Sequence, residues 1–143
     1  MLVHLNYYNR RGKELDDSIA KMKSLAEAIP NTDSVPELMG IEGLIRQEYY
    51  TAFDVILNDF NMGSRTKQPP ENEVNALISF GNMICYTETL RAIHQTQLNP
   101  TISYLHTPGE RRYSLCLDVS EIFKPIIVDR VIFKVLNKRL IQD

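Results

Sequence analysis

The chain has 143 residues, of which 43% are hydrophobic and 24% charged, and its formal net charge is −2. A chain of this length fits one domain that buries about 70% of its unfolded surface. The small net charge excludes binding of a polyanion through overall basicity, so any nucleic-acid contact must be local or come from another segment. No apolar run approaches the roughly 20 residues of a membrane span, and no signal peptide opens the chain, so we expect a cytoplasmic protein without a membrane partner.

The first half of the chain shows helical periodicity interrupted by short polar stretches. A first helix is predicted over residues 12–29, and the sequence "PNTDS" ends it. Ser34 is the predicted N-cap of a second, long helix over residues 35–60, and Glu37 completes a capping box three residues later.

The second half begins with a loop over residues 61–72, which contains a double proline, and a mostly apolar helix is predicted over residues 73–97. Gly81 within that helix permits close helix packing. The two cysteines, Cys85 and Cys116, lie in apolar helical contexts, which indicates reduced core thiols and no disulfide framework.

The last predicted helix begins at Ser114, as its N-cap, and is interrupted at Pro125. The proline ring clashes with the carbonyl group of Glu121, so we expect a kink or a new helix start there. Helical periodicity resumes over residues 126–143, and no internal repeat is present. The sequence therefore predicts a single all-α domain spanning residues 1–143.

Glu42 lies on the apolar face of its predicted helix. Leu38, Ile45 and Tyr49 stand at positions that share a helix face with it. A buried carboxylate must find a cation, a metal ion or a proton, because an unpaired charge is costly to bury. A buried salt bridge with an arginine is the plain structural alternative.

Asp118 and Glu121 are three residues apart, so they project from one face of an otherwise apolar helix. Two such carboxylates repel each other unless positive charge lies nearby. A divalent cation removes that repulsion, since hard cations prefer carboxylate oxygens. His106 precedes a predicted Pro-Gly turn that can fold its imidazole toward these acids.

Simpler roles for these side chains stay open. Asp118 fits a late cap or a partner of Arg111 or Arg112, and a lone histidine is usually a satisfied polar group. The residues alone indicate a candidate site and no particular reaction.

Three stretches resemble one family. "MGIEGLIRQEYY" is similar to its EG…YF segment, "NEVNALISFGNMICYTETL" to its Asn-Ala-Leu-Leu-Ser-Phe-Gly-Tyr segment, and "LNPTISYLHTPGERRYSLCLDVSEIFKPIIVDR" to its LH…SLALDL-x-E-x-FRP…VDR run. These segments resemble the CRISPR-associated integrases that insert new spacers, the first-numbered family of Cas proteins. The resemblance covers about the last hundred residues in the right order.

The resemblance implies a helical catalytic domain that binds magnesium or manganese. It places the metal ligands, which are also the catalytic residues, at Glu42, His106 and Glu121. Asp118 matches the nearer acid of the family's acid pair, as an auxiliary ligand or as support for one.

The resemblance further implies a metal-dependent DNA endonuclease or integrase that catalyses phosphoryl transfer, joining new spacer DNA to the repeat array. The basic residues expected to contact DNA are Arg65, Lys67, Arg111 and Arg112, although ordinary surface charge explains each equally well. We expect the fragment alone to be inactive, because the family's N-terminal β-domain and its last C-terminal helices are expected to be missing from it.

The implied partners are DNA, a second copy in the full-length homodimer, and a smaller adaptation protein. Two alternatives stay open. One is a non-catalytic helical interaction module in which the acids and the histidine form salt bridges only. The other is a related integrase of a mobile element. The neighbourhood of the gene distinguishes the two, since transposon ends indicate the mobile element and a repeat array indicates spacer acquisition.

Overall fold

The computed structural model describes residues 1–106 and 113–141. No strand is present in these residues, which confirms the predicted all-α class. The α-helices are α1 (Leu2–Asn9), α2 (Asp16–Glu27), α3 (Val35–Thr51), α4 (Phe53–Ile56), α5 (Glu73–Ile93), α6 (Ser114–Lys124) and α7 (Arg130–Asn137). A 3₁₀ turn, Ile29–Asn31, follows α2, and a π-helical segment, Pro125–Asp129, joins α6 to α7.

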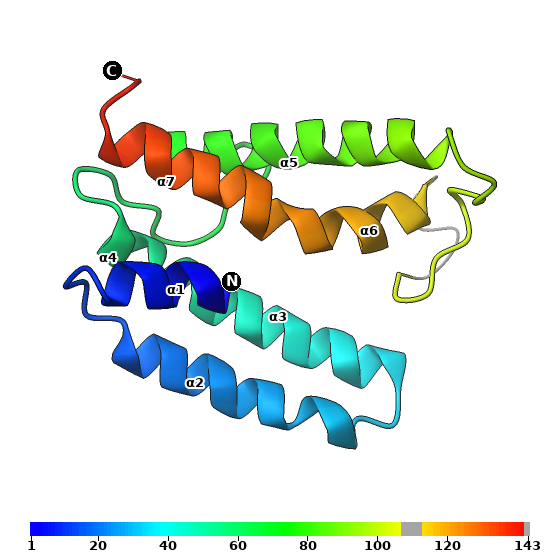
Figure 1. The fold of residues 1–143 in the computed structure, drawn as a ribbon, viewed down its shortest axis with the longest axis horizontal. Helices are drawn as coiled ribbons and strands as arrows, with labels where there is room; N and C mark the ends of the chain where they lie inside the picture. Colours follow the sequence, from blue (N-terminus) through cyan, green and yellow to red (C-terminus); the bar gives the residue numbers. More distant parts are fainter. Residues whose placement is uncertain (107–112, 142–143) are drawn as a thin grey trace.

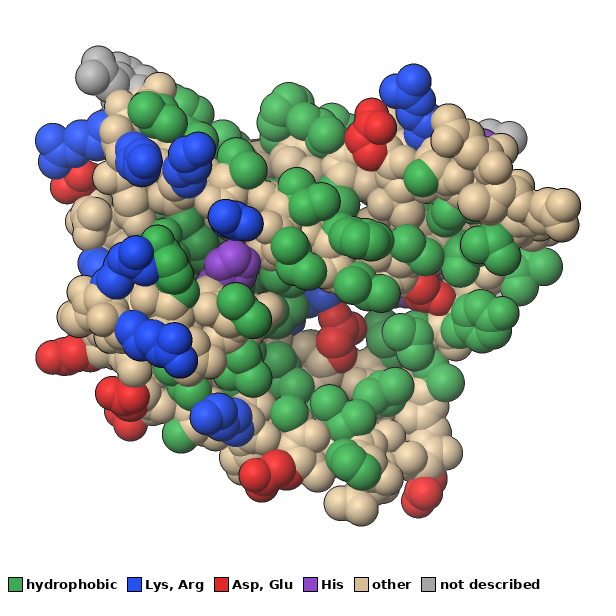
Figure 2. Space-filling view, viewed as in Figure 1, with side chains coloured by type: hydrophobic (Ala, Val, Ile, Leu, Met, Phe, Trp, Pro, Cys, Tyr) green, Lys and Arg blue, Asp and Glu red, His purple; other side chains and the backbone are tan. Residues whose placement is uncertain are grey.

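The helices form two layers (Figure 1). In one layer α5 packs along both α6 and α7, and in the other α2 packs against α1 and α3. The space-filling view shows a hollow where the α5–α6 side and the α2–α3 side separate, and acidic and basic side chains lie at it (Figure 2).

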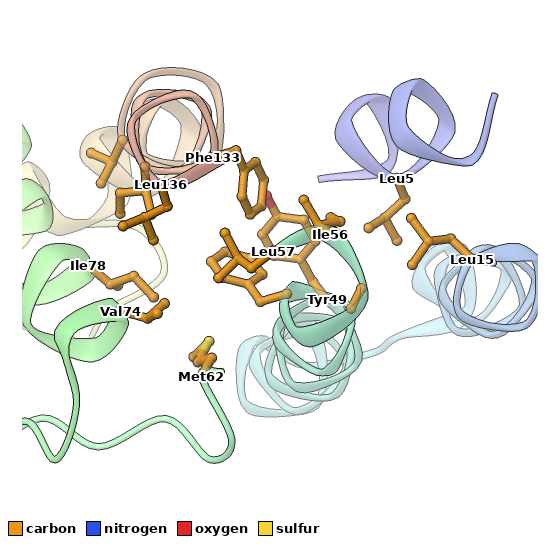
Figure 3. Close-up of a cluster of buried hydrophobic side chains, with 14 of the residues drawn as sticks. Leu5, Leu15, Tyr49, Ile56, Leu57, Met62, Val74, Ile78, Phe133 and Leu136 are labelled. Atoms are coloured by element: carbon orange, nitrogen blue, oxygen red, sulfur yellow. The ribbon is translucent and has the colours of Figure 1, made fainter. Parts of the chain in front are cut away.

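Aromatic and aliphatic side chains fill the region where the layers meet (Figure 3). Phe53 from α4 and Phe133 from α7 are each no more than 1% exposed, and their ring centroids lie 4.6 Å apart in an edge-to-face arrangement. Such aromatic pairs add about 0.5–1.5 kcal/mol beyond the burial of their surface. The same buried cluster includes Tyr49 of α3 and Ile78 of α5, so it joins the two layers.

Local sequence rules account for the start of α3. The Ser34 hydroxyl accepts a hydrogen bond from the Glu37 N–H, which confirms the predicted cap. The Glu37 carboxylate accepts from the backbone N–H of Asp33, one residue before the position that a capping box requires.

Other helix boundaries differ from the prediction. The expected helix over 12–29 begins at Asp16, and the helix over 2–9 was missed. Gly12 has a φ of 86° in the turn between them, a conformation that glycine adopts readily. The expected helix over 35–60 is divided into α3 and α4 and ends at Ile56. In the loop that follows, the Met62 N–H donates to the Asp54 carboxylate.

Pro125 ends α6, as predicted, and the chain continues through the π-helical segment into α7. The carbonyl of Pro125 lies 2.8 Å from Nε2 of His4, which ties this segment to α1. Ser114 is not the N-cap of α6, because its buried hydroxyl donates to the Thr101 carbonyl, 3.0 Å away.

Gly81 permits the close packing that the sequence predicted. A methyl group at this position would lie 2.4 Å from Cγ1 of Val128, so only glycine fits without movement. Cys85 and Cys116 are buried free thiols, as expected. Within the described residues, no helix has the length and apolar character needed to cross a membrane.

A candidate metal centre between α3 and α6

Arg46 joins two of the predicted ligands. Its Nη2 atom lies 2.5 Å from Oε2 of Glu121 on α6 and also forms an ion pair with Glu42, one turn earlier on α3. The partner of Glu42 is thus an arginine, the plain structural alternative that the sequence offered, and the Glu42 side chain is 39% exposed where the sequence predicted a buried carboxylate. The carboxylates of Glu42 and Glu121 come from separate helices and share one guanidinium group.

Lys124 adds a second positive charge by pairing with the other oxygen of Glu121. Burial alone would raise the pKa of Glu121, but Arg46 and Lys124 outweigh this effect, so that pKa lies below its usual value. Burial alone would lower the pKa of Arg46, whereas its two glutamate partners raise the pKa above its usual value. Both groups are therefore charged at neutral pH.

Asp118 organises the segment that carries His106. Its Oδ2 atom accepts the backbone N–H groups of Tyr104 and Leu105 at 2.7 and 3.0 Å. Its Oδ1 atom accepts the His106 N–H at 3.2 Å and lies 2.6 Å from Nδ1 of the imidazole. Asp118 thus acts on the loop before α6, and engagement of Nδ1 leaves Nε2 as the ring nitrogen able to bind a metal ion.

The three predicted ligands are only partly assembled. Glu42 and Glu121 meet at Arg46, whereas His106 is joined to Asp118, one turn before Glu121 on α6. Within residues 1–106 and 113–141, no three acidic, histidine or cysteine side chains lie close enough together to hold a metal ion.

The donor chemistry nevertheless suits a divalent cation. Oε2 of Glu121 is buried and accepts no hydrogen bond of good geometry, and its contact is the ion pair with Arg46. Carboxylate oxygens on facing helices, together with an imidazole on the loop before one of them, are the donor types that bind magnesium or manganese.

The residues predicted to contact DNA have different environments. Arg65 donates to Oδ1 of Asn75 at 3.0 Å and to the Ser79 hydroxyl at 2.8 Å, so its guanidinium is held against α5. Lys67 is exposed. Arg111 and Arg112 lie outside the described residues.

Three charged residues at or near the candidate metal centre were not predicted as site residues. Arg46 stands four residues after Glu42 and Lys124 three residues after Glu121, spacings that favour helical ion pairs and offered a signal. Asp129 is only 4% exposed and lies against Tyr49. Burial raises the pKa of Asp129 to about 6, although the Tyr49 hydroxyl and nearby positive charges lower it.

Comparison with known proteins identifies relatives over the whole chain. The family described as "CRISPR associated protein Cas1" matches residues 1–143. The chain is 52% identical, over 96% of its length, to CRISPR-associated endonuclease Cas1 2 of Thermodesulfovibrio yellowstonii. It is 50% identical, over 98% of its length, to CRISPR-associated endonuclease Cas1 of Fusobacterium nucleatum, and it spans 42% of each relative.

Solved structures agree with the fold. A Cas1 protein from Thermotoga maritima superposes with a TM-score of 0.84 over 90% of this chain and 43% of that protein, at 42% identity. A chain of a Cas6-RT-Cas1–Cas2 complex matches 99% of this chain and 16% of its own length with a TM-score of 0.89 at 22% identity, which shows the fold alone. The extent of these matches places the chain in the CRISPR associated protein Cas1 family.

Proposed function

We propose that this chain provides the catalytic part of a divalent-metal-dependent DNA endonuclease or integrase that acts in spacer acquisition. The convergence of Glu42 and Glu121 on one cation, from two different helices, carries the proposal. The relatives named as CRISPR-associated endonucleases support the reaction class. The chain spans about two-fifths of these relatives, so activity, substrate and partners belong to the whole protein.

Glu42, His106 and Glu121 would hold magnesium or manganese. An ion bound there would stabilise negative charge on a DNA phosphate during attack by a 3′-hydroxyl or water. Asp118 would hold the imidazole with Nε2 available, since it engages Nδ1. Arg46 and Lys124 would supply positive charge beside the phosphate.

The expected partners are DNA, a second copy of the protein and a small Cas2-type subunit. The Cas6-RT-Cas1–Cas2 complex, which contains a chain of the same fold, includes a Cas2 subunit and supports the last of these partners. Lys67 is exposed and available for a phosphate contact, and Arg111 and Arg112 stay candidates from the sequence.

Strand-transfer activity of the full-length protein tests the function. With manganese, Glu42→Ala and His106→Ala should each lower the rate by about 100-fold or more, because each removes a ligand. Glu88→Ala is the matched control, since the Glu88 side chain is 64% exposed on α5 and pairs with Arg91 there. Rates equal to wild type in both ligand variants would remove these residues from the mechanism.

A non-catalytic interaction module is the second candidate. The ion pairs of Arg46 favour it, because a guanidinium group already satisfies both carboxylates. Binding of Mn²⁺ separates the two functions: an ion whose binding depends on His106 supports the enzyme, and no binding at millimolar Mn²⁺ supports the module.

A further inference from the structure

Arg46 occupies the place where the two acidic ligands converge. Its guanidinium contacts Glu42 and Glu121 together, so a divalent ion that binds both carboxylates needs the same space. The Arg46 side chain is 26% exposed, and the helix that carries it, α3, packs against α2. Its long side chain can therefore leave the carboxylates without a change in the fold.

The charges of the cluster favour exchange over addition. Two carboxylates face two cations, Arg46 and Lys124, so the group is balanced as it stands. A divalent ion added beside an unmoved Arg46 would leave two surplus positive charges in a partly buried place, which is unfavourable at such short range. A DNA phosphate brought to the displaced guanidinium would neutralise one of these two charges, and arginine binds phosphate in a bidentate manner.

We propose that Arg46 and a divalent cation exchange at the Glu42–Glu121 pair, and that the displaced guanidinium binds the DNA phosphate. This inference rests on the proposed metal-dependent function. It assigns Arg46 two positions, as the counter-ion of the acids before metal binds and as a phosphate ligand afterwards. Metal binding and DNA binding therefore strengthen each other, by equal factors in both directions.

Manganese titration of the full-length protein tests the exchange, with bound Mn²⁺ measured by electron paramagnetic resonance. Arg46→Met should bind Mn²⁺ about ten-fold more tightly than wild type, because no cation has to leave. Without metal, the same variant should melt at a lower temperature, since the two acids lose their shared partner. Arg91→Met is the control, because Arg91 also stands beside a glutamate, Glu88, on an exposed helix face.

DNA-binding measurements test the second half of the proposal, the binding of a DNA phosphate by Arg46. In saturating Mn²⁺, Arg46→Met should bind a DNA duplex more weakly, and the slope of log affinity against log salt should fall by about one. An unchanged salt slope overturns the phosphate role. If Arg46→Met unfolds without metal, recovery of its melting transition on adding Mn²⁺ replaces the titration, and no recovery overturns the exchange.

The outcomes separate this inference from the function on which it rests. In one outcome, wild type binds Mn²⁺, His106→Ala does not, and Arg46→Met binds Mn²⁺ no more tightly than wild type. This outcome overturns the exchange and leaves the metal site intact. No His106-dependent binding in wild type overturns both.

Discussion

The Nδ1 atom of His106 lies 2.6 Å from Oδ1 of Asp118, and the same carboxylate accepts three consecutive backbone N–H groups. Burial alone would raise the pKa of Asp118, but the imidazole and these N–H groups together bring that pKa below its usual value. A charged Asp118 therefore fixes both the loop and the ring. The carboxylate accepts a hydrogen bond from the Nδ1–H group, so in a neutral imidazole Nε2 carries no proton and is free to bind a metal ion.

Asp118→Asn should reverse the tautomer of His106. The amide oxygen is expected to take the place of Oδ2, which accepts the two shorter hydrogen bonds from the backbone. The NH₂ group then takes the place of Oδ1, where it loses the hydrogen bond from the His106 N–H and donates to Nδ1. The proton then lies on Nε2, and Mn²⁺ affinity should fall by about 10–100-fold. Nitrogen-15 NMR of the imidazole in metal-free protein reports the tautomer directly.

Asp59→Asn is the control, because Asp59 is an exposed partner of Arg139. Its imidazole spectrum should match that of wild type. A proton retained on Nδ1 in Asp118→Asn, with unchanged Mn²⁺ affinity, would mean that Asp118 supports only the loop.

Features set by neighbours in sequence were predictable. The cap at Ser34 and the break at Pro125 each follow from the local chemistry of one or two residues. Helix phase also indicated a positive partner for Glu42, which Arg46 provides, but it overstated the burial of that carboxylate.

Features that depend on the packing of separate helices were not predictable. Which cation meets Glu42 and Glu121 depends on how α3 approaches α6, and periodicity does not report that distance. Arg65 shows the same limit, because its loop sequence reads as exposed, whereas Asn75 and Ser79 of α5 bind its guanidinium.

Gly81→Ala should destabilise the protein by about 1–3 kcal/mol, the cost of overpacking a close helix contact. The added methyl group would meet Val128 at 2.4 Å. Gly40→Ala is the matched control on α3, where an added Cβ meets nothing within 4 Å. It should stabilise the helix by about 0.5–1 kcal/mol. Urea unfolding measures both, and equal effects of the two substitutions would contradict the packing argument.

Arg65→Met should lower the free energy of unfolding by more than about 2 kcal/mol, because hydrogen bonds from a charged group to Asn75 and Ser79 are lost. Lys67→Met, at an exposed position in the same loop, should change stability by less than about 0.5 kcal/mol. A loss of DNA binding in Arg65→Met should therefore accompany a lower melting temperature. Weaker DNA binding at unchanged stability would instead support a direct phosphate contact by Arg65.

Asp129 should make folding stability depend on pH between about 4 and 6. Its pKa is raised from the ordinary value of 3.8 to about 6 in the folded protein, mainly by burial. In this window the folded state binds more protons than the unfolded state, so the free energy of unfolding decreases as the pH rises. The contribution present at low pH and lost by neutral pH is about 3 kcal/mol.

Asp129→Asn removes this titration while keeping a polar group beside Tyr49. Its free energy of unfolding should therefore rise relative to that of wild type as the pH increases from 4 to 7, which urea denaturation at each pH measures. Asp17→Asn, at an exposed position on α2, should follow the wild-type curve. Parallel pH curves for wild type and Asp129→Asn would show that Asp129 stays charged over this range. In that case Arg46 and the other nearby positive groups would outweigh the cost of burying the carboxylate.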